Sequence, residues 1–315
     1  MADTFYPYDR ELYSRWFLDC YQRQSMVMLA EHNPDVTMLL HRALISTDDI
    51  LDQAIRRQIP KYDFASRLFD PDDLRSIGLV REDIPVESYA ESRDLILETV
   101  ATHDYVIIMI DVFYLPHTPE YRKQHVVHSI TLREFDERTK EWSLIDDNPA
   151  SVLCWYRYPE EIVAASLDNN TRRRVRFYST VEAAEGAAQA HARDAFAASV
   201  REFRDSHRLL ADVVDIVGCP WIAPEKVIGF LHDAFSLHLG SRICLREFVG
   251  RTVGDGPAVT ALETIAAHGA DIQNMLLLGK VTGFVDADDL KSVCAELRVA
   301  EEELLAELTA VTGTA

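Results

Sequence analysis

The sequence predicts an α+β protein, in which helices pack on an antiparallel sheet, followed by an all-helical domain. Residues 1–160 mix helical segments with β-branched and aromatic runs such as YVIIMIDVFYL. Residues 125–147 have the pattern of two strands joined by a charged turn. Beyond residue 160, apolar residues recur at helical spacing and strand signals nearly vanish. A boundary near SLDNNTRRRV gives predicted domains of 1–165 and 166–315.

Caps and stops indicate the helices of the first domain. In DCYQRQSMVMLAEH, Asp19 is a suitable N-cap and Asn33-Pro34 ends the pattern. STDDILDQAIRRQ begins with two hydroxyl residues and carries acids in its first turn, where the helix dipole favours them. SYAESRDLILETVATH is a third helical segment. A buried strand, DYVIIMIDVFYL, and a proline-containing loop then lead into the hairpin.

The hairpin HVVHSITLREFDERTKEWSLIDD, residues 125–147, is predicted to place one histidine beside one aspartate. Paired residues of two antiparallel strands have a constant sum of residue numbers. Pairing His128 with Asp146 also sets Ile130 against Leu144, and the next pair on that face is apolar as well. A one-residue slip would break this face, so the pattern specifies the register. We therefore expect His128 and Asp146 side by side on the core-facing surface, where a carboxylate orients an imidazole.

Cys20 is the predicted nucleophile for this pair. It follows a candidate N-cap and lies in the first turn of a helix, where backbone N–H groups and the helix dipole favour a thiolate. The apolar stretch MVMLA behind it indicates a buried helix with only its N-terminus at a surface. A cysteine at a helix start, followed along the chain by a histidine and an aspartate, is the order of papain-like cysteine enzymes. Cys20, His128 and Asp146 are therefore the candidate catalytic residues.

Two other interpretations of these residues stay open. A lone cysteine is more often a small core residue than a nucleophile, so the chain is alternatively a catalytically silent binding protein. His117, His125 and His128 with Asp111 are candidate metal ligands. However, a His-x-x-His pair suits a helix face, whereas strand residues three apart point to opposite sides. We therefore expect neither a metal nor a cofactor of the protein's own.

Composition limits the partners and the location. The 315 residues carry a formal net charge of −20, and so acidic a chain repels nucleic acids and anionic membranes. The longest apolar run is about half of the roughly 20 residues that a membrane-spanning helix needs. The five cysteines include no CxxC pair, which argues against a structural zinc site and a disulfide framework. No signal peptide is evident, so we expect a cytoplasmic protein.

Several of these motifs resemble a known family. DVFYLPHTPEYRKQHVVHSITLREFD followed by WSLIDDNP, with DC opening an early helix, is similar to the N-terminal domain of the butirosin-biosynthesis protein H family. That family belongs to the papain-like superfamily, and the similarity covers roughly residues 15–160. It implies a papain-like fold for the first domain and a Cys-His-Asp site carried by Cys20, His128 and Asp146.

The resemblance also implies an activity. An acyl group would move from a carrier-protein thioester, through Cys20, to an amine or hydroxyl of a small-molecule acceptor. The partner would be an acyl or peptidyl carrier protein that bears phosphopantetheine. A cysteine peptidase, amidase or thioesterase on the same triad is the alternative.

The sequence departs from its relatives at two places. Glu134–Asp136 is EFD where relatives have GYD. Ser14 stands where papain-type peptidases keep a glutamine that binds the oxyanion. The backbone N–H of Cys20 remains as an expected oxyanion donor, with Gln22 and Gln24 as weaker candidates.

The helical half offers fewer signals. A cluster of arginines in this acidic chain is a candidate docking patch for an acidic carrier protein, although a solvated linker is the plainer interpretation. The cluster consists of Arg172, Arg173, Arg174 and Arg176. The helical domain itself is a candidate cover for an acyl pocket or a candidate homodimer interface.

Overall fold

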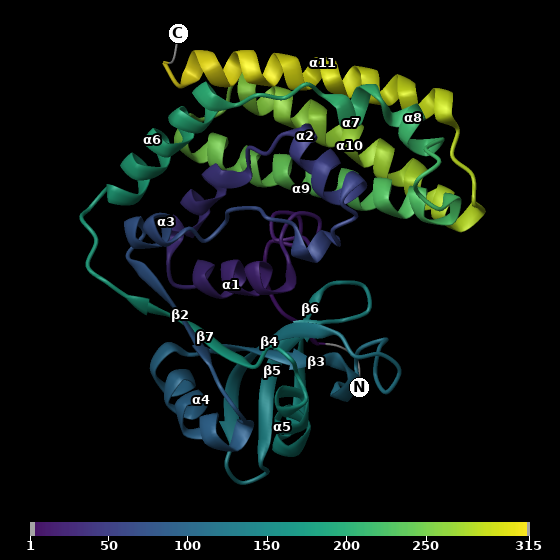
Figure 1. Cartoon of the computed structure of the whole chain (residues 1–315). Helices are drawn as coiled ribbons and strands as arrows, with labels where there is room; N and C mark the ends of the chain where they lie inside the picture. Colours follow the sequence, from purple (N-terminus) through teal and green to yellow (C-terminus); the bar gives the residue numbers. More distant parts are fainter. Residues whose placement is uncertain (1–3, 314–315) are drawn as a thin grey trace. The chain divides into compact units, whose positions relative to one another are not determined.

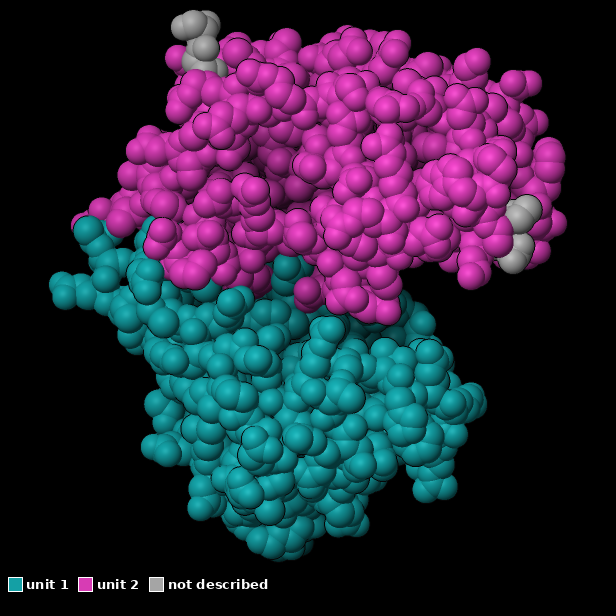
Figure 2. Space-filling view, in the orientation of Figure 1, with its two compact units in different colours: residues 1–15, 20–34, 74–184 teal, residues 16–19, 35–73, 185–315 magenta. Residues whose placement is uncertain are grey.

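The computed structural model describes residues 4–313, without the side chains of residues 224 and 225. The chain forms two compact units, coloured separately in Figure 2. Unit 1 comprises residues 1–15, 20–34 and 74–184, and unit 2 comprises residues 16–19, 35–73 and 185–315. No helix between residues 4 and 313 combines the length and the apolar character that crossing a membrane requires.

Unit 1 is built on a seven-stranded sheet with the order β1-β6-β5-β4-β3-β7-β2. Every neighbouring pair in this sheet is antiparallel, so the predicted α+β class with an antiparallel sheet is confirmed. The strands are β1 (Thr4–Phe5), β2 (Leu79–Pro85), β3 (Val106–Asp111), β4 (Val127–Asp136), β5 (Glu141–Asp147), β6 (Leu153–Pro159) and β7 (Arg174–Thr180).

Helices cover both faces of the sheet (Figure 1). On one face, α4 (Tyr89–His103) and α5 (Glu160–Asp168) close an apolar core. Alternate residues of β3, β4 and β5 supply that core from the sheet, because successive strand residues point to opposite faces. α1 (Cys20–Ala30) packs on the other face, against β4 and β3. The short helix η4 (Val112–Tyr114) follows β3, and α3 (Pro71–Ser76) begins in unit 2 and passes into unit 1 after Asp73.

The β4–β5 hairpin forms, but two residues out of the predicted register. Leu132 pairs with Leu144, a residue-number sum of 276 where the prediction required 274. A β-bulge between Leu132 and Glu134 and a turn at residues 137–140 produce the offset. The register differs from the prediction by two residues, and a shift of two leaves every side chain on its predicted side of the sheet. His128 and Asp146 therefore lie on the same side as the apolar pair Leu132–Leu144.

Unit 2 is helical in its described residues. Its elements are η1 (Pro34–Ala43), α2 (Thr47–Ile50), η2 (Leu51–Arg56), η3 (Lys61–Asp63), α6 (Ala187–Glu202), α7 (Arg208–Ala211), α8 (Val213–Val217), α9 (Pro224–Thr252), α10 (Pro257–Thr282) and α11 (Ala287–Val311). A buried ion pair fastens α9 to α11, because Arg242 Nε and Nη2 lie 2.8 and 2.9 Å from the Glu301 carboxylate. His238 Nε2 lies 2.8 Å from the same carboxylate.

The division of the chain differs from a single cut after residue 165. β7 lies beyond the predicted boundary, yet it is hydrogen-bonded between β3 and β2 inside the sheet. Residues 35–73 precede the boundary, yet they belong to the helical unit. The sequence does not predict β7, because the charges of RVRFYST hide the β-branched and aromatic alternation of a strand.

Candidate active site

The three predicted residues meet in unit 1. Cys20 is the first residue of α1, His128 is the second residue of β4, and Asp146 is the penultimate residue of β5. His128 Nε2 lies 2.7 Å from Asp146 Oδ1, and the side chain of His128 is hydrogen-bonded to Cys20. Because Nε2 meets the carboxylate, the other ring nitrogen is left for the sulfur. A thiol, an imidazole and a carboxylate are thus connected in series.

The α1 helix runs along β4 and so delivers its first residue to the beginning of that strand. Its middle is fixed by Gln24, whose Nε2 donates to the Ser129 carbonyl oxygen at 2.8 Å. Its far end is fixed by Glu31, the residue after the helix, which pairs with Arg133 at 3.2 Å. Cys20 therefore lies at a helix N-terminus, where N–H groups have no partner within the helix and the dipole favours negative charge.

Gln24, one of the weaker candidates for an oxyanion donor, contacts the sheet and Asp146 instead. Its amide nitrogen donates to the Ser129 carbonyl and lies 3.3 Å from Asp146 Oδ1, behind the histidine. Its amide oxygen accepts from the Thr131 hydroxyl at 3.5 Å. Both N–H groups of this amide are therefore used, and the amide orients Asp146. Gln24 has no N–H left to donate to a substrate oxyanion, so its assignment as an oxyanion donor is wrong.

Electrostatics favour the charged forms of His128 and Asp146. Burial by itself would lower the pKa of His128, but Asp146 and Cys20 raise this pKa to about 10 through charge and hydrogen bonding. Burial would raise the pKa of Asp146, but His128 and His117 bring it down to about 2. An imidazolium beside Cys20 is the environment that stabilises a thiolate.

His117 is a member of the site that the sequence reasoning placed only among metal ligands. Its Nε2 lies 2.9 Å from Asp146 Oδ2, so the carboxylate is shared by two imidazoles. Its Nδ1 lies 2.8 Å from the Tyr158 hydroxyl, and its ring stacks on Tyr156 with centroids 3.9 Å apart. His117 belongs to the loop between η4 and β4, and loop positions carry no periodicity from which the contact could be predicted.

The two adjacent aspartates have different partners. Asp147 pairs with the buried Arg23 of α1 and with Arg15, whose Nη1 lies 3.1 Å from Asp147 Oδ2. Arg23 also donates to the Ser151 carbonyl oxygen at 2.9 Å. Strand alternation thus separates the two carboxylates, with Asp146 beside the histidines and Asp147 beside the arginines.

The four-residue metal arrangement considered from the sequence does not form. His125 Nδ1 lies 2.6 Å from Asp111 Oδ2, and the ring stacks on Phe113 with centroids 4.3 Å apart. Among the described residues, no group of potential metal ligands contains His125 or Asp111. A group of His128, Asp146 and Asp147 does exist, but both carboxylates already bind cationic side chains.

A hollow of about 990 Å³ adjoins the site. His117 is part of its wall, and Trp155, Tyr156 and Tyr158 of β6 supply aromatic surface to it. Arg133 and Arg157 contribute positive charge to the same wall. The hollow combines apolar surface with a few charged groups, which is the usual composition of a small-molecule site.

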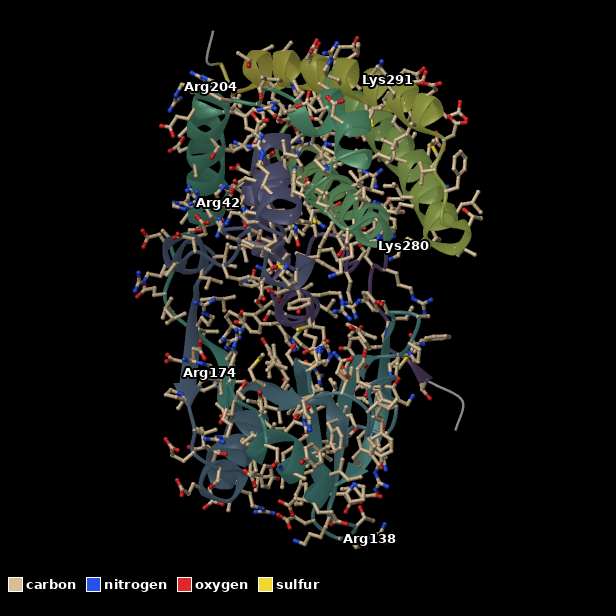
Figure 3. The ribbon with its side chains drawn as sticks, turned by 45° about the vertical axis from the view of Figure 1, so that its right-hand side comes forward. Arg42, Arg138, Arg174, Arg204, Lys280 and Lys291 are labelled. Atoms are coloured by element: carbon tan, nitrogen blue, oxygen red, sulfur yellow. The ribbon has the colours of Figure 1, made fainter. Side chains whose placement is uncertain are left out.

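The arginine cluster is only partly available as a docking patch. Arg174, labelled in Figure 3, and Arg176 both pair with Asp83 of β2, at 3.2 and 3.0 Å. Arg173 donates to the Asp168 carbonyl oxygen at 3.1 Å. Arg172, Arg173 and Arg174 still line a shallow hollow of about 400 Å³ beside β2.

Comparison with known proteins gives one distant relative and no family. No family model matches the chain. The chain is 26% identical over 137 residues to a protein of Niallia circulans, the ribostamycin:4-(gamma-L-glutamylamino)-(S)-2-hydroxybutanoyl-[BtrI acyl-carrier protein] 4-(gamma-L-glutamylamino)-(S)-2-hydroxybutanoate transferase. The match covers 42% of this chain and 45% of the relative, so the chain spans about half the length of the protein it matches. This likeness agrees with the resemblance to the butirosin-biosynthesis family, as a distant one.

Proposed function

We propose that the protein is a cysteine-dependent acyltransferase that takes an acyl group from a carrier-protein thioester and passes it through Cys20 to an amine or hydroxyl acceptor. The observation that carries the proposal is the connected Cys20, His128 and Asp146, with the cysteine at a helix N-terminus and the other two on neighbouring strands. This order and placement support a papain-like site as part of the proposal. The relative's printed name describes a transferase acting on an acyl group held by a carrier protein, which favours a thioester as donor.

The reaction has two balanced steps. The Cys20 thiolate, whose proton is held by His128, attacks the thioester carbonyl, and the bond to the carrier sulfur breaks. His128 returns the proton to that departing sulfur. The acceptor then attacks the Cys20 thioester while His128 takes its proton, and Cys20 is released as a thiolate beside the reprotonated imidazole.

Asp146 and the helix start have supporting roles. Asp146 holds the imidazole in one orientation and stabilises its positive charge, and His117 and Gln24 hold the carboxylate. The N–H of Cys20 is the donor for the oxyanion of each tetrahedral intermediate. Exchange of one thioester for another is nearly isoenergetic, so a modest oxyanion site suffices, and for this reason we favour transfer over peptide hydrolysis.

The test is detection of the acyl-enzyme. The protein is incubated with aminoacyl thioesters of N-acetylcysteamine and of carrier-bound phosphopantetheine, and intact masses are measured. We expect a mass increase equal to one acyl group, absent in Cys20→Ala and retained in Cys219→Ala. Cys219 is the matched control because it is also partly exposed. An adduct that persists in Cys20→Ala would sink the proposal, and cleavage of peptides without any adduct from thioesters would favour a peptidase.

A further inference from the structure

Three potential metal ligands meet in unit 2, from three separate segments. His41 lies in η1, Asp73 in α3 and His191 in α6. His41 Nε2 lies 3.2 Å and His191 Nε2 lies 2.8 Å from Asp73 Oδ1. The three ligand atoms all lie within 4.8 Å of one another. They belong to the helical unit, so nothing in the proposed transfer reaction uses them.

The buried histidine of this group lacks hydrogen bonds. The His41 side chain is only 1% exposed, and neither of its ring nitrogens has a hydrogen-bond partner. A neutral imidazole carries one donor and one acceptor, and buried polar groups of this kind are normally satisfied. His41 Nε2 lies 3.2 Å from Asp73 Oδ1 without forming an aligned hydrogen bond. A cation placed between them would satisfy both groups.

Arg42 holds the carboxylate in place for such a cation. Its Nε donates to Asp73 Oδ2 at 2.8 Å and its Nη2 donates to Oδ1 at 3.1 Å (Arg42 is labelled in Figure 3). A carboxylate oxygen has two lone pairs, so beside Arg42 Oδ1 keeps one, which meets His191 Nε2 at 2.8 Å and would be available to a cation in place of that hydrogen bond. Carboxylates that ligate metals are themselves commonly fixed by hydrogen bonds from the surrounding residues.

The group is also accessible. A hollow of about 380 Å³ within unit 2 has His41, Arg42 and Ser66 in its wall. His191 is 36% exposed, so water can reach the group from its side as well. An ion can therefore enter, and water can complete its coordination.

We propose that His41, Asp73 and His191 form a binding site for a divalent transition-metal ion, with zinc as the ion that suits these donors best. Two imidazole nitrogens and one carboxylate oxygen are a common ligand set for zinc with a further open position. With metal–ligand bonds of about 2.1 Å, neighbouring ligand atoms lie about 3 to 3.5 Å apart, which is close to the two separations at Asp73 Oδ1. The ion would join the segment 35–73 to α6 and thereby stabilise unit 2.

The experiment is zinc titration by calorimetry on the full chain, in a Cys20→Ala background so that the candidate active-site thiol cannot bind metal. His191→Gln keeps a hydrogen-bond donor for Asp73 but removes a ligand. His268→Gln is the matched control, because His268 is a partly exposed histidine of unit 2 that lies 3.7 Å from a single carboxylate, that of Glu296. Thermal unfolding is followed with and without zinc as a second readout.

We expect one equivalent of zinc to bind with micromolar or tighter affinity and to raise the unfolding temperature. Both effects should be lost in His191→Gln and retained in His268→Gln. Absence of binding to the parent chain would overturn the proposal, and so would binding that survives in His191→Gln. Loss of binding in a His128→Gln variant instead would move the site to the sheet unit and would equally overturn it. If His191→Gln unfolds, Asp73→Asn replaces it with the same expected outcome.

Discussion

At the scale of single residues, chemical role follows from surroundings more than from residue type, and the five cysteines show this. Cys20 and Cys219 are partly exposed, whereas Cys154, Cys244 and Cys294 are buried. Burial raises the pKa of Cys244 and Cys294 to about 12, so these thiols are protonated and slow to react. Only Cys20, of the two partly exposed cysteines, is hydrogen-bonded to a histidine whose pKa is raised.

The first prediction is selective alkylation of Cys20. With limiting iodoacetamide at pH 6, about two units below the ordinary thiol pKa, Cys20 should react at least tenfold faster than Cys219, because an imidazolium beside its sulfur favours the thiolate. Peptide mass spectrometry gives both rates in one sample. In His128→Gln the Cys20 rate should fall to that of Cys219. Equal rates for the two cysteines in the parent protein would contradict the assignment.

The second prediction concerns stability and pH. The pKa of His128 is raised to about 10, so its pairing stabilises the fold fully below about pH 6.5 and is lost as pH rises toward 10. The pKa of Asp146 is lowered to about 2, so its contribution is present above about pH 4 and is lost as pH falls toward 2. His128→Gln should therefore lower the free energy of unfolding by about 3 kcal/mol between about pH 4 and 6.5, and by much less near pH 10.

Urea unfolding at a series of pH values measures this difference. His125→Gln is the control, since it also removes a histidine from an aspartate, but its side chain is 65% exposed. Asp111 is buried, but it also accepts from the backbone N–H of Phe113 and the imidazole of His125 lies largely in solvent, so this variant should change the free energy of unfolding by less than about 1 kcal/mol at every pH. A loss in His128→Gln that does not vary with pH would mean that packing, and not charge, supports His128.

The third prediction makes His117 a positioning residue for the proposed reaction. His117→Phe keeps a ring against Tyr156 but loses the hydrogen bond to Asp146. A hydrogen bond to a charged group is worth about 1.5–3 kcal/mol, so acylation of Cys20 should slow about 10- to 100-fold.

KM should change little, and His117→Gln should recover part of the rate. Tyr158→Phe, which leaves the His117–Asp146 bond intact, should stay near the parent rate. An unchanged rate and pH profile in His117→Phe would rule out this role.

At the scale of elements, alternation along a strand was predictable and registry between strands was not. The apolar face of the hairpin identified which histidine and which aspartate share a side, and this holds in the structure. Their direct opposition does not hold, because the four-residue turn at 137–140 and the bulge next to Leu132 together move the register by two residues. No residue type near Arg133 signals a bulge, so only the contacts of the folded sheet reveal it. The contact survives because a diagonal neighbour lies within reach of an imidazole.

The fourth prediction belongs to the longest helix, α9. A Cβ at Gly240 would lie 2.6 Å from the backbone nitrogen of Phe17 and 2.8 Å from the Cβ of Trp16. Backbone cannot move aside cheaply, so Gly240→Ala should destabilise unit 2 by about 1–3 kcal/mol. Gly250 lies in the same helix with nothing within 4 Å of an added Cβ, so Gly250→Ala should gain up to about 1 kcal/mol through helix propensity. Urea unfolding compares the two, and similar effects of both changes would contradict the close approach.

At the scale of the whole molecule, the chain does not separate into its two units at a single point. The first segment of the chain supplies α1 to the sheet, the next supplies residues 35–73 to the helical unit, and the chain then returns to the sheet until residue 184. Sequence patterns describe local structure, so they located the change from mixed to helical character near residue 165. They could not show that residues 35–73 find their apolar partners among helices that follow more than a hundred residues later, since nothing local encodes that choice.

The fifth prediction follows from this interleaving. A chain ending at residue 165 loses β7, which leaves the edges of β3 and β2 without their hydrogen-bonded neighbour. It also loses α6 to α11, which are most of the unit in which Leu39, Leu40 and Ile55 are buried. Burying side chains of this kind is worth about 1.5–3 kcal/mol each, so their exposure is more than a marginally stable chain tolerates.

We expect residues 1–165 to show no cooperative thermal transition by circular dichroism. Residues 1–184 restore β7 and the end of α5 (Glu160–Asp168), whose Leu167 is buried in the core, but not the helices. A cooperative transition there assigns the loss to the missing part of the sheet unit, and its absence assigns the loss to the missing helices. A cooperative transition in 1–165 would instead mean that the helical unit is dispensable for the fold of the sheet.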